Sequence, residues 1–329
     1  MTVLATVFSG SVTTLASGTE NKQSTRHTFA EPHLGTFVRL IFYSQDERTA
    51  AKEKADRCFK RVRELDAVFS DYRDDSELTL LCQKAVQTPH EVSPELFAVL
   101  SFARKVSARS EGAFDITLGR DTKRWRARRD GKDPAHDSPQ NERVSYRDLV
   151  LDPEKQTITL LKPLQLDLGG IAKGYIADQL LSLLRQSGIK EAAVIIGGEI
   201  VLADAPPGKD GWRIGLSNPE QKIIGSLVLT NTALSTSGDT YQFFEEGNGE
   251  RRAHLIDPTS RKGKSNRLNV TTIAPTAMQA DAWATALRIL PTAQALEIAG
   301  KEPDLEACFI PLEGPQLKTP AFPEPVGQR

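Results

Sequence analysis

The stretch LDLGGIAKGY, residues 166–175, decides how the rest of the chain is interpreted. It begins as a short apolar segment that closes at Asp167, and Gly169 and Gly170 then form a turn without Cβ atoms, so backbone can approach a ligand closely. Apolar residues recur at helical spacing after the turn. A strand, a glycine turn and a helix start present free backbone N–H groups to an anion, and Lys173 adds a positive charge in the first helical turn.

On its own, this stretch is open to two interpretations. It lacks the G-x-G-x-x-G pattern of a dinucleotide-binding turn and the G-K-[ST] of a P-loop, and glycine turns before helices are common. A purely structural turn and a phosphate site both fit. The other motifs of the chain have to decide between them.

Composition places the chain among soluble globular proteins of one large or two modest domains, with ample capacity for a core. Its 42 basic and 43 acidic side chains nearly cancel, so no overall field recruits nucleic acid or an anionic membrane. The three cysteines, Cys58, Cys82 and Cys308, lack metal-ligand spacing, and their odd number argues against a disulfide framework. No apolar run is long enough to span a bilayer.

Both ends of the chain are predicted to lie outside the folded domain. Residues 1–18 are apolar and rich in small side chains but have no basic segment, so a degraded or truncated export signal and a disordered leader both remain open. Residues 1–30 are expected to form this leader, residues 31–312 the folded domain, and residues 313–329 a flexible, proline-rich tail.

The order of elements predicts an α+β fold. A strand is expected from His33 to Ser44, a long amphipathic helix from Asp46 to Phe69, and a second helix capped by Ser93 with Pro94 at its first position. Short strands at regular spacing follow the central helix. Since helices gather early and strands late, mixed or antiparallel strands packed against helices fit better than alternating βαβ units.

Two stretches that precede residues 166–175 differ in polarity: one is apolar with a single carboxylate, and the other is rich in arginine. In GAFDITLG, Asp115 lies in an apolar setting and requires a partner, because an unpaired buried carboxylate is costly. Residues 120–145 carry several arginines around Trp125. A contact with phosphate or nucleic acid is one interpretation, but the pattern is more typical of a solvated surface excursion.

Two later stretches combine polar groups with apolar strands. STSGD, residues 235–239, puts hydroxyls and a carboxylate at a turn, and an ordinary Ser/Thr turn explains it equally well. In AHLIDP, strand alternation places His254 and Ile256 on one face and Asp257 on the other, so the histidine and the aspartate are not expected to pair.

The stretch PTAMQADAWATALRIL predicts a helix from Ala277, capped by Thr276. Asp281 and Thr285 lie four residues apart on one face of it, and the alanines around them let another group come close. A carboxylate and a hydroxyl are hard oxygen ligands that suit Mg²⁺. Structural capping of a neighbouring loop is the alternative.

Together, the motifs HLGT, FSDYRDDSEL, GAFDITLG, LDLGGIAKGYIAD, IIGGEI, STSGD, HLIDP and DAWATAL resemble, in their order, the ApbE family of FAD:protein FMN transferases. The resemblance runs from about His33 to Leu290. It implies a single large α+β domain of the ApbE flavin-transferase type and an Mg²⁺-dependent enzyme with FAD as substrate. Such an enzyme cleaves the pyrophosphate of FAD, passes FMN to a threonine or serine hydroxyl of a target flavoprotein, and releases AMP.

The resemblance also implies roles for particular residues. Asp281 and Thr285 are expected to be Mg²⁺ ligands, with the backbone carbonyl of Gly170 as a third. His254 is expected to be the general base on the incoming hydroxyl, because the ordinary pKa of histidine is near neutral. The positions expected to contact the flavin substrate FAD through its flavin part are Leu34, Tyr72, Ala113, Phe114, Asp115, Asp167, Lys173 and Ile256.

Two segments depart from the family pattern. Leu34-Gly35-Thr36 stands where the family usually has Met-Gly-Thr, which is a mild apolar exchange. Residues 259–263 follow HLIDP in place of the family's usual Arg-Thr-Gly, which puts the local contacts of that loop with flavin or acceptor in question.

Three functions remain open at this point: the transferase, a pyrophosphatase that gives FMN and AMP with the same site, and a flavin-binding protein without chemistry. No nucleic-acid partner is expected. By family analogy the protein is expected to be exported and to work at the outer face of the cytoplasmic membrane or in the periplasm, with peripheral membrane association possible and a cytoplasmic location not excluded.

Overall fold

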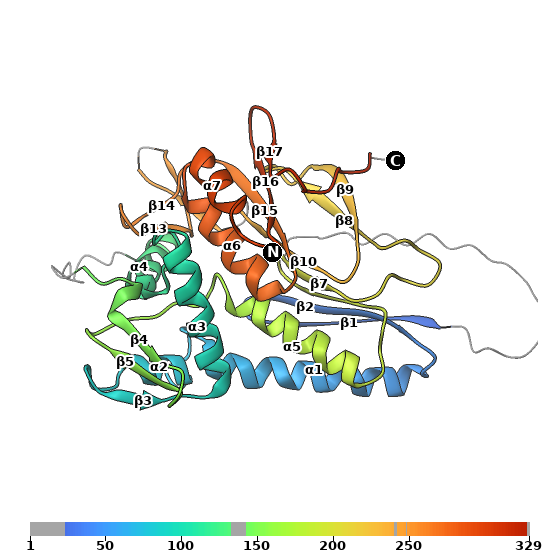
Figure 1. Ribbon diagram of the computed structural model, residues 1–329, viewed down its shortest axis with the longest axis horizontal. Helices are drawn as coiled ribbons and strands as arrows, with labels where there is room; N and C mark the ends of the chain where they lie inside the picture. The colour runs from blue at the N-terminus through green and yellow to red at the C-terminus, as the bar shows by residue number, and fades with distance from the viewer. Residues whose placement is uncertain (1–23, 133–142, 240–241, 248, 328–329) are drawn as a thin grey trace, which may run out of the picture.

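The structure, a computed structural model, describes residues 24–132, 143–239, 242–247 and 249–327 (Figure 1). Most of the expected leader, residues 1–23, lies outside this part of the chain. The helices are α1 (Arg48–Phe69), α2 (Glu77–Cys82), α3 (Pro94–Arg109), α4 (Gly119–Arg129), α5 (Ala172–Gln186), α6 (Ala277–Ile289) and α7 (Thr292–Ala299), with 3₁₀ turns at Ile116–Leu118 and Tyr146–Asp148.

The strands of the large sheet are β1 (Thr25–His33), β2 (Thr36–Ser44), β6 (Ala192–Ile196), β7 (Glu199–Leu202), β10 (Ala233–Ser237), β15 (Leu268–Ala274), β16 (Glu306–Pro311) and β17 (Leu317–Lys318). The smaller sheets contain β3 (Pro89–Glu91), β4 (Leu149–Asp152), β5 (Thr157–Leu160), β8 (Trp212–Ser217), β9 (Ile223–Leu229), β11 (Phe243–Glu245), β12 (Arg251–Ala253), β13 (Ile256–Asp257) and β14 (Lys262–Gly263).

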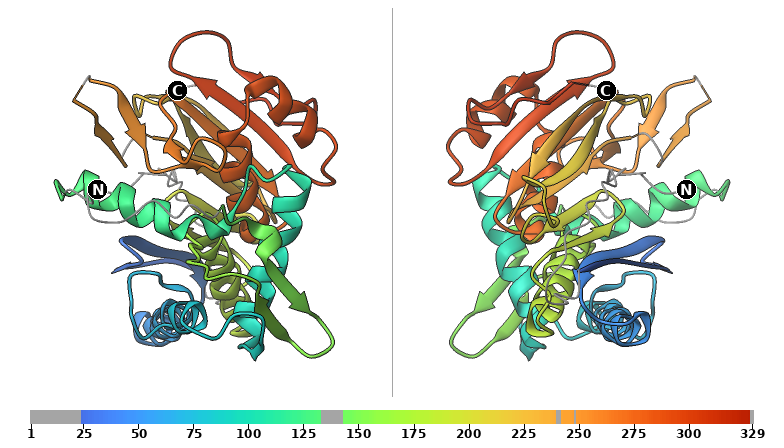
Figure 2. Two further views of the ribbon diagram at one scale, coloured as in Figure 1. Left: turned by 90° about the vertical axis from the view of Figure 1, so that its left-hand side faces the viewer. Right: turned by 90° about the vertical axis from the view of Figure 1, so that its right-hand side faces the viewer.

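Within the described residues the large sheet has the order β1-β2-β6-β7-β10-β15-β16-β17, and each neighbouring pair is antiparallel. Helices α1, α5 and α6 pack on one face of it, and the hairpin β8–β9 packs on the other (Figures 1 and 2). The α+β prediction with antiparallel strands and packed helices is therefore confirmed.

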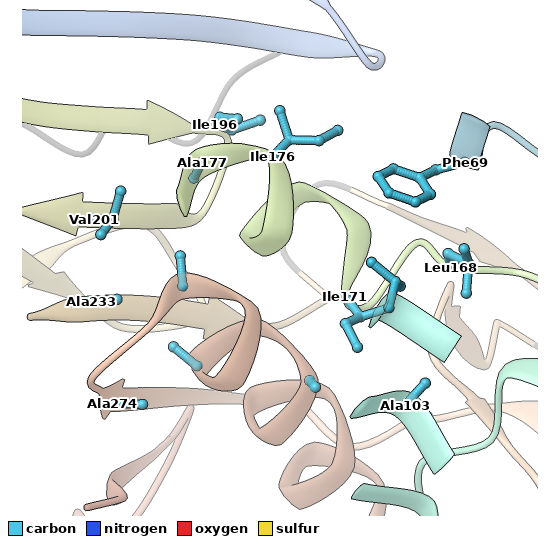
Figure 3. Close-up of a cluster of buried hydrophobic side chains, with 14 of the residues drawn as sticks. Phe69, Ala103, Leu168, Ile171, Ile176, Ala177, Ile196, Val201, Ala233 and Ala274 are labelled. Carbon is cyan, nitrogen blue, oxygen red and sulfur yellow. The ribbon is translucent and has the colours of Figure 1, made fainter. Parts of the chain in front are cut away.

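The main core fills the space between the sheet and these helices (Figure 3). Ile176 and Ala177 of α5 meet Ile196 and Val201 of the sheet there. Ile171, just before α5, is also buried in this core, so the glycine turn of the central stretch is anchored on both sides by apolar packing. This packing fixes the position of the glycine turn relative to the sheet.

The first hairpin corrects the predicted start of the fold. Residues 1–30 were expected to form a leader, whereas β1 pairs with β2 along its whole length from Thr25. The turn between them is made by Leu34 at φ 55° and Gly35 at φ 70°, and positive φ at both central residues is the type I′ hairpin geometry. A leucine in the left-handed region is uncommon, which is why the pattern favoured one strand through this point.

The segment after residue 312 also differs from the prediction, because it packs on the fold. Strand β17 pairs with β16, and Thr319 exchanges hydrogen bonds with Ala307. Phe322 is only 3% exposed in the core under β8–β9, and Val326 bridges to Ser226. The prolines of this segment limit its backbone donors, but these side chains still anchor it.

Residues 120–145 were predicted as a surface excursion, and that prediction was wrong over residues 120–129, which belong to helix α4. Its charged residues are good helix formers, and Trp125 supplies the apolar anchor. Trp125 packs with Leu118 and Ile256, and its indole N–H donates to the carbonyl of Arg252 at 3.3 Å. The remaining part of the excursion, residues 133–142, lies outside the described residues.

Several other predictions are confirmed. Helix α1 begins at Arg48, and α3 begins after Ser93, whose hydroxyl accepts from the backbone N–H of Leu96. Thr276 caps α6 by accepting from the N–H of Gln279. No helix in the part of the chain that the structure describes is long and apolar enough to cross a membrane.

Candidate active site

Four loops meet at one end of the large sheet and bring the central motifs together. They are the turn before β2, the Gly197–Gly198 turn between β6 and β7, the end of β10, and the glycine turn before α5. Gly198 lies against the backbone of Thr236, and the hydroxyls of Ser237 and Thr285 are 3.4 Å apart. Residues distant in sequence thus form one polar region beside α6.

Glycines allow α5 and its preceding turn to approach α6 closely. A Cβ added to Gly170 would lie 2.8 Å from Thr285 Oγ1, and one added to Gly174 would lie 2.2 Å from the carbonyl oxygen of Ala277. Asp178 of α5 accepts from the backbone N–H groups of Ala277 and Met278 at 2.8 and 2.9 Å, which caps the start of α6. These contacts hold Thr285 beside the Gly170 backbone, as the predicted metal set requires.

Asp281 lies in the same buried region and is only 3% exposed. Its Oδ2 accepts from the backbone N–H of Gly174 at 3.1 Å. Burial raises the pKa of Asp281 to about 7, against the opposing effect of the nearby Lys173 charge. A cation placed beside this carboxylate would favour its ionised form.

Lys173 points from the first turn of α5 to Glu199, with 2.7 Å between Nζ and Oε1. Burial opposes the charged ammonium, but the carboxylates of Asp281 and Glu199 outweigh it and raise the pKa of Lys173. The lysine therefore stays positively charged at neutral pH. We call Gly170, Lys173, Glu199, Asp281 and Thr285 the helix side of the site.

A second group of residues surrounds Arg126 of α4. Its guanidinium contacts Asp71 at 2.5 Å and Asp167 at 3.1 Å, and it lies 4.0 Å from the ring centre of Tyr72. Asp167 also accepts from the N–H of Gly169 at 2.7 Å. Arg126 thereby joins two predicted FAD contacts, Tyr72 and Asp167, to the glycine turn.

His254 lies before β13, with its ring 6.1 Å from that of Trp125. Its Nδ1 is 3.3 Å from the carbonyl oxygen of Gln242, which favours the proton on Nδ1 and leaves Nε2 as the acceptor. Burial, together with the positive charges of Lys173 and Arg288, lowers the pKa of His254 to about 4. Tyr72, Trp125, Arg126, His254 and Ile256 form what we call the hairpin side.

The expected separation of His254 from Asp257 agrees with the hydrogen bonds, since Asp257 Oδ1 accepts from the backbone N–H of Thr259 at 2.8 Å. Asp115 has the partners that its burial requires: Thr117 donates through both its N–H and its hydroxyl, and the N–H of Tyr146 donates to the second oxygen. Burial nevertheless raises the pKa of Asp115.

Three predicted FAD contacts have side chains that pack within the protein. Phe114 is part of the main core, Ala113 packs with Leu255 and Ile289, and Ile256 packs with Trp125. Leu34, by contrast, shapes the turn before β2. Contacts of these residues with FAD stay predictions.

Comparison with known proteins identifies the family of this chain. The ApbE family model matches residues 34–309, most of the chain. The chain belongs to the ApbE family. The FAD:protein FMN transferase of Haemophilus influenzae is 32% identical over 82% of each chain, and that of Salmonella typhimurium is 30% identical over 88% of this chain and 86% of the relative.

Solved ApbE structures share the fold. The flavinyl transferase ApbE of Pseudomonas stutzeri, in its apo form, has a TM-score of 0.78 and 26% identity, covering 91% of this chain and 96% of that one. The flavin transferase ApbE of Vibrio cholerae has a TM-score of 0.76 and 25% identity, covering 91% and 98%. This chain thus belongs to an enzyme family of transferases.

The helix side of this ApbE chain fits a magnesium ion with few protein ligands. Across the residues that the structure describes, no group of three or more His, Cys, Asp or Glu side chains could hold a metal. Mg²⁺, however, is usually held by one or two carboxylates together with substrate phosphates and water. One buried carboxylate, Asp281, with the Thr285 hydroxyl packed on the Gly170 backbone, matches that pattern.

Several residues around this site were given no role in the sequence-based prediction. Glu199 and Arg126 had a usable signal, because each is a charge beside buried apolar residues that needs a partner. Asp239 and Arg288 are fully buried neighbours at the ends of β10 and α6, and Asp239 lies 3.3 Å from Arg251 Nε. Nothing in the spacing of these residues along the chain indicates that they meet.

Proposed function

We propose that this ApbE-family chain transfers FMN from FAD to a threonine or serine hydroxyl of a target flavoprotein, releases AMP, and requires Mg²⁺. The observation that carries the proposal is the meeting of Asp281 and Thr285 with the Gly170 turn beside the charged Lys173. Hard oxygen ligands and a positive charge at a helix start suit a pyrophosphate. The names of the relatives support the same reaction.

In this proposal the helix side binds and orients the pyrophosphate of FAD. Asp281, Thr285 and the Gly170 carbonyl would hold Mg²⁺, which when bound neutralises charge that develops on the phosphate oxygens. Lys173 supplies a further positive charge, which Glu199 holds in place. Since α5 and α6 are packed at backbone distance, these groups need little rearrangement on binding.

His254 is proposed to take the proton of the acceptor hydroxyl. With its Nδ1 proton directed to Gln242, the neutral ring offers the Nε2 lone pair. The hydroxyl oxygen forms a bond to the FMN phosphorus, the bond from that phosphorus to the bridging oxygen of the pyrophosphate breaks, and AMP leaves with the bridging oxygen. The hydroxyl proton goes to Nε2.

The test is AMP release from FAD and Mg²⁺, measured with and without an acceptor flavoprotein. The proposal expects AMP only when the acceptor is present, in a one-to-one ratio with flavin covalently bound to it. AMP released at the same rate without acceptor would instead establish a pyrophosphatase, in which water replaces the hydroxyl. FAD binding with no AMP in either reaction would leave a flavin-binding protein.

We also propose an exported location at the outer face of the cytoplasmic membrane or in the periplasm, with peripheral membrane association. Family analogy alone supports it. Fractionation of cells that express the full chain, followed by detection of the protein in membrane, periplasmic and cytoplasmic fractions, tests it directly. Recovery of the protein only in the cytoplasm would contradict it.

A further inference from the structure

Glu199 has one carboxylate oxygen in use and one without a partner. The residue is only 4% exposed, and Oε1 accepts from Lys173 at 2.7 Å. Oε2 is buried and has no hydrogen-bond donor among the residues that the structure describes. A buried charged oxygen without a donor costs free energy, so an unpaired atom at a binding site requires an explanation.

The position of Oε2 indicates which part of the site it serves. Glu199 begins β7 directly after the Gly197–Gly198 turn, and a Cβ added to Gly197 would lie 3.5 Å from Glu199 Oε2 and 3.4 Å from Thr36 Oγ1. Thr36 begins β2, two residues after Leu34. Oε2 therefore belongs to the corner of the sheet end formed by the β6–β7 turn and the turn before β2.

This corner borders the oxygen of Glu199 that does not contact Lys173. Oε1 accepts from Lys173, whose charge interacts with that of Asp281, whereas Gly197 and Thr36 lie beside Oε2. The resemblance implies that Leu34 contacts the flavin, and Leu34 forms the turn beside this corner. If Lys173 and Asp281 hold the pyrophosphate, the corner is therefore placed to receive the FMN half of FAD. That half offers the flavin ring N–H and the ribityl hydroxyls as donors, and an ionised carboxylate only accepts.

We propose that Glu199 binds FAD directly, with Oε2 accepting a hydrogen bond from an N–H or O–H donor of the FMN half. This inference rests on the proposed function, because it takes FAD as the ligand. Glu199 then has two roles at once: Oε1 orients Lys173, and Oε2 selects a ligand that carries a donor. A charge-assisted hydrogen bond of this kind is stronger than a neutral one.

Glu199→Gln tests the proposal because the amide keeps the shape and one oxygen for Lys173, but it presents N–H₂ where the ligand donor arrives. Affinity is measured for FAD, for FMN, and for ADP, which carries the adenosine half with two phosphates. FAD and FMN are expected to bind at least ~10-fold more weakly, while ADP affinity stays within about twofold. Unchanged FAD affinity, or an equal loss for FAD and ADP, would overturn the proposal.

Asp178→Asn is the matched control. Asp178 is also a largely buried carboxylate, but both of its oxygens accept from the start of α6. It is expected to lower thermal stability without changing the ratio of FAD to ADP affinity. A shift in that ratio equal to that of Glu199→Gln would show that loss of any buried carboxylate suffices, and would contradict the assignment.

If Glu199→Gln does not fold, the proposal can still be tested with the wild-type protein by changing the ligand. Wild-type protein is titrated with FAD analogues that carry a methyl group on flavin N3 or lack one ribityl hydroxyl. At least one analogue is expected to bind about 10-fold more weakly than FAD, and that analogue identifies the donor. Equal affinity for FAD and every analogue would refute the proposal.

These binding measurements separate the inference from the proposed function. A protein that binds FAD through Glu199 but forms no covalent flavin on any acceptor would contradict the transferase and leave the binding role intact. Transfer of flavin to an acceptor, with an FAD affinity that does not depend on Glu199, would support the transferase and contradict the binding role of Glu199.

Discussion

The helix side and the hairpin side of the site are built differently. On the helix side, backbone atoms of α5 and α6 approach so closely that glycines are required, and Asp281 and Glu199 are almost fully buried. On the hairpin side, Tyr72 is 72% exposed, and Arg126 connects it to the rest through side chains alone. The helix side is preorganised by backbone packing, whereas the hairpin side combines buried Trp125 and Ile256 with an exposed rim at Tyr72.

This difference suits the two substrates of a transferase. A pyrophosphate and its metal need fixed charges at fixed positions, which close packing supplies. A protein acceptor has to reach His254 from solvent, and a more open wall with neighbouring hairpins allows that. Changes on the helix side should therefore reduce the rate most, and changes at the rim of the hairpin side should reduce it least.

The largest effect is expected for Asp281→Ala. Loss of this carboxylate should lower the rate of flavin transfer by ~10²-fold or more, the scale for removing a main electrostatic stabiliser. Initial rates are measured over a range of Mg²⁺ concentrations, and chelation of Mg²⁺ should stop the wild-type reaction until the ion is restored. Near-normal turnover of the variant in dilute Mg²⁺ would refute the metal assignment.

The next effect concerns His254. Because Nε2 has to accept a proton, His254→Ala should slow transfer by ~10²-fold, the lower range for a general base, with little change in FAD affinity. Equal losses in rate and in FAD affinity would indicate a binding role instead.

The pH dependence of the wild-type rate follows from the same residue. Since burial lowers the pKa of His254 from 6.5 to about 4, the ring stays neutral and able to accept a proton down to about pH 5. The acid limb of kcat/KM should therefore fall near pH 4. A limb near 6.5 that disappears in His254→Ala would contradict this account of its environment.

Gly170→Ala should have an intermediate effect. The new Cβ would meet Thr285 Oγ1 at 2.8 Å, so the turn or the hydroxyl has to move, and a shift of this kind should slow transfer by ~10-fold or more. Gly247→Ala is the matched control, because a Cβ there meets nothing within 4 Å. A loss in Gly170→Ala no larger than in the control would show that the close contact is unimportant.

The smallest effect is expected for Arg126→Lys. Lysine keeps the charge but cannot contact Asp71 and Asp167 with one planar fork or stack as well on Tyr72. Because lysine still supplies a positive charge between the two carboxylates, KM for FAD should rise by less than about tenfold with kcat nearly unchanged. A large fall in kcat would show that Arg126 takes part in the chemical step. It would also contradict the expectation that changes on the hairpin side reduce the rate least.

Elements with local signals could be predicted from the sequence. The caps of α3 and α6 and the spacing of Asp281 and Thr285 depend on residues three or four apart, and the structure has them as expected. The resemblance of the motif order correctly indicated the family.

Features that depend on long-range packing could not be predicted. The Leu34 turn requires an uncommon φ that only the pairing of β1 with β2 enforces, and Phe322 is buried only because the β8–β9 hairpin covers it. Glu199 is similar: its chemistry was visible in the sequence, but the distance to Lys173, 26 residues earlier, was not.

The most direct test of the account is the mass of an acceptor flavoprotein after incubation with FAD and Mg²⁺ in the presence of the wild-type chain or Asp281→Ala. The account predicts that wild-type protein adds one FMN to a threonine or serine and releases one AMP, and that Asp281→Ala adds almost none in the same time. An unmodified acceptor with wild-type protein, or equal modification with both proteins, would contradict it.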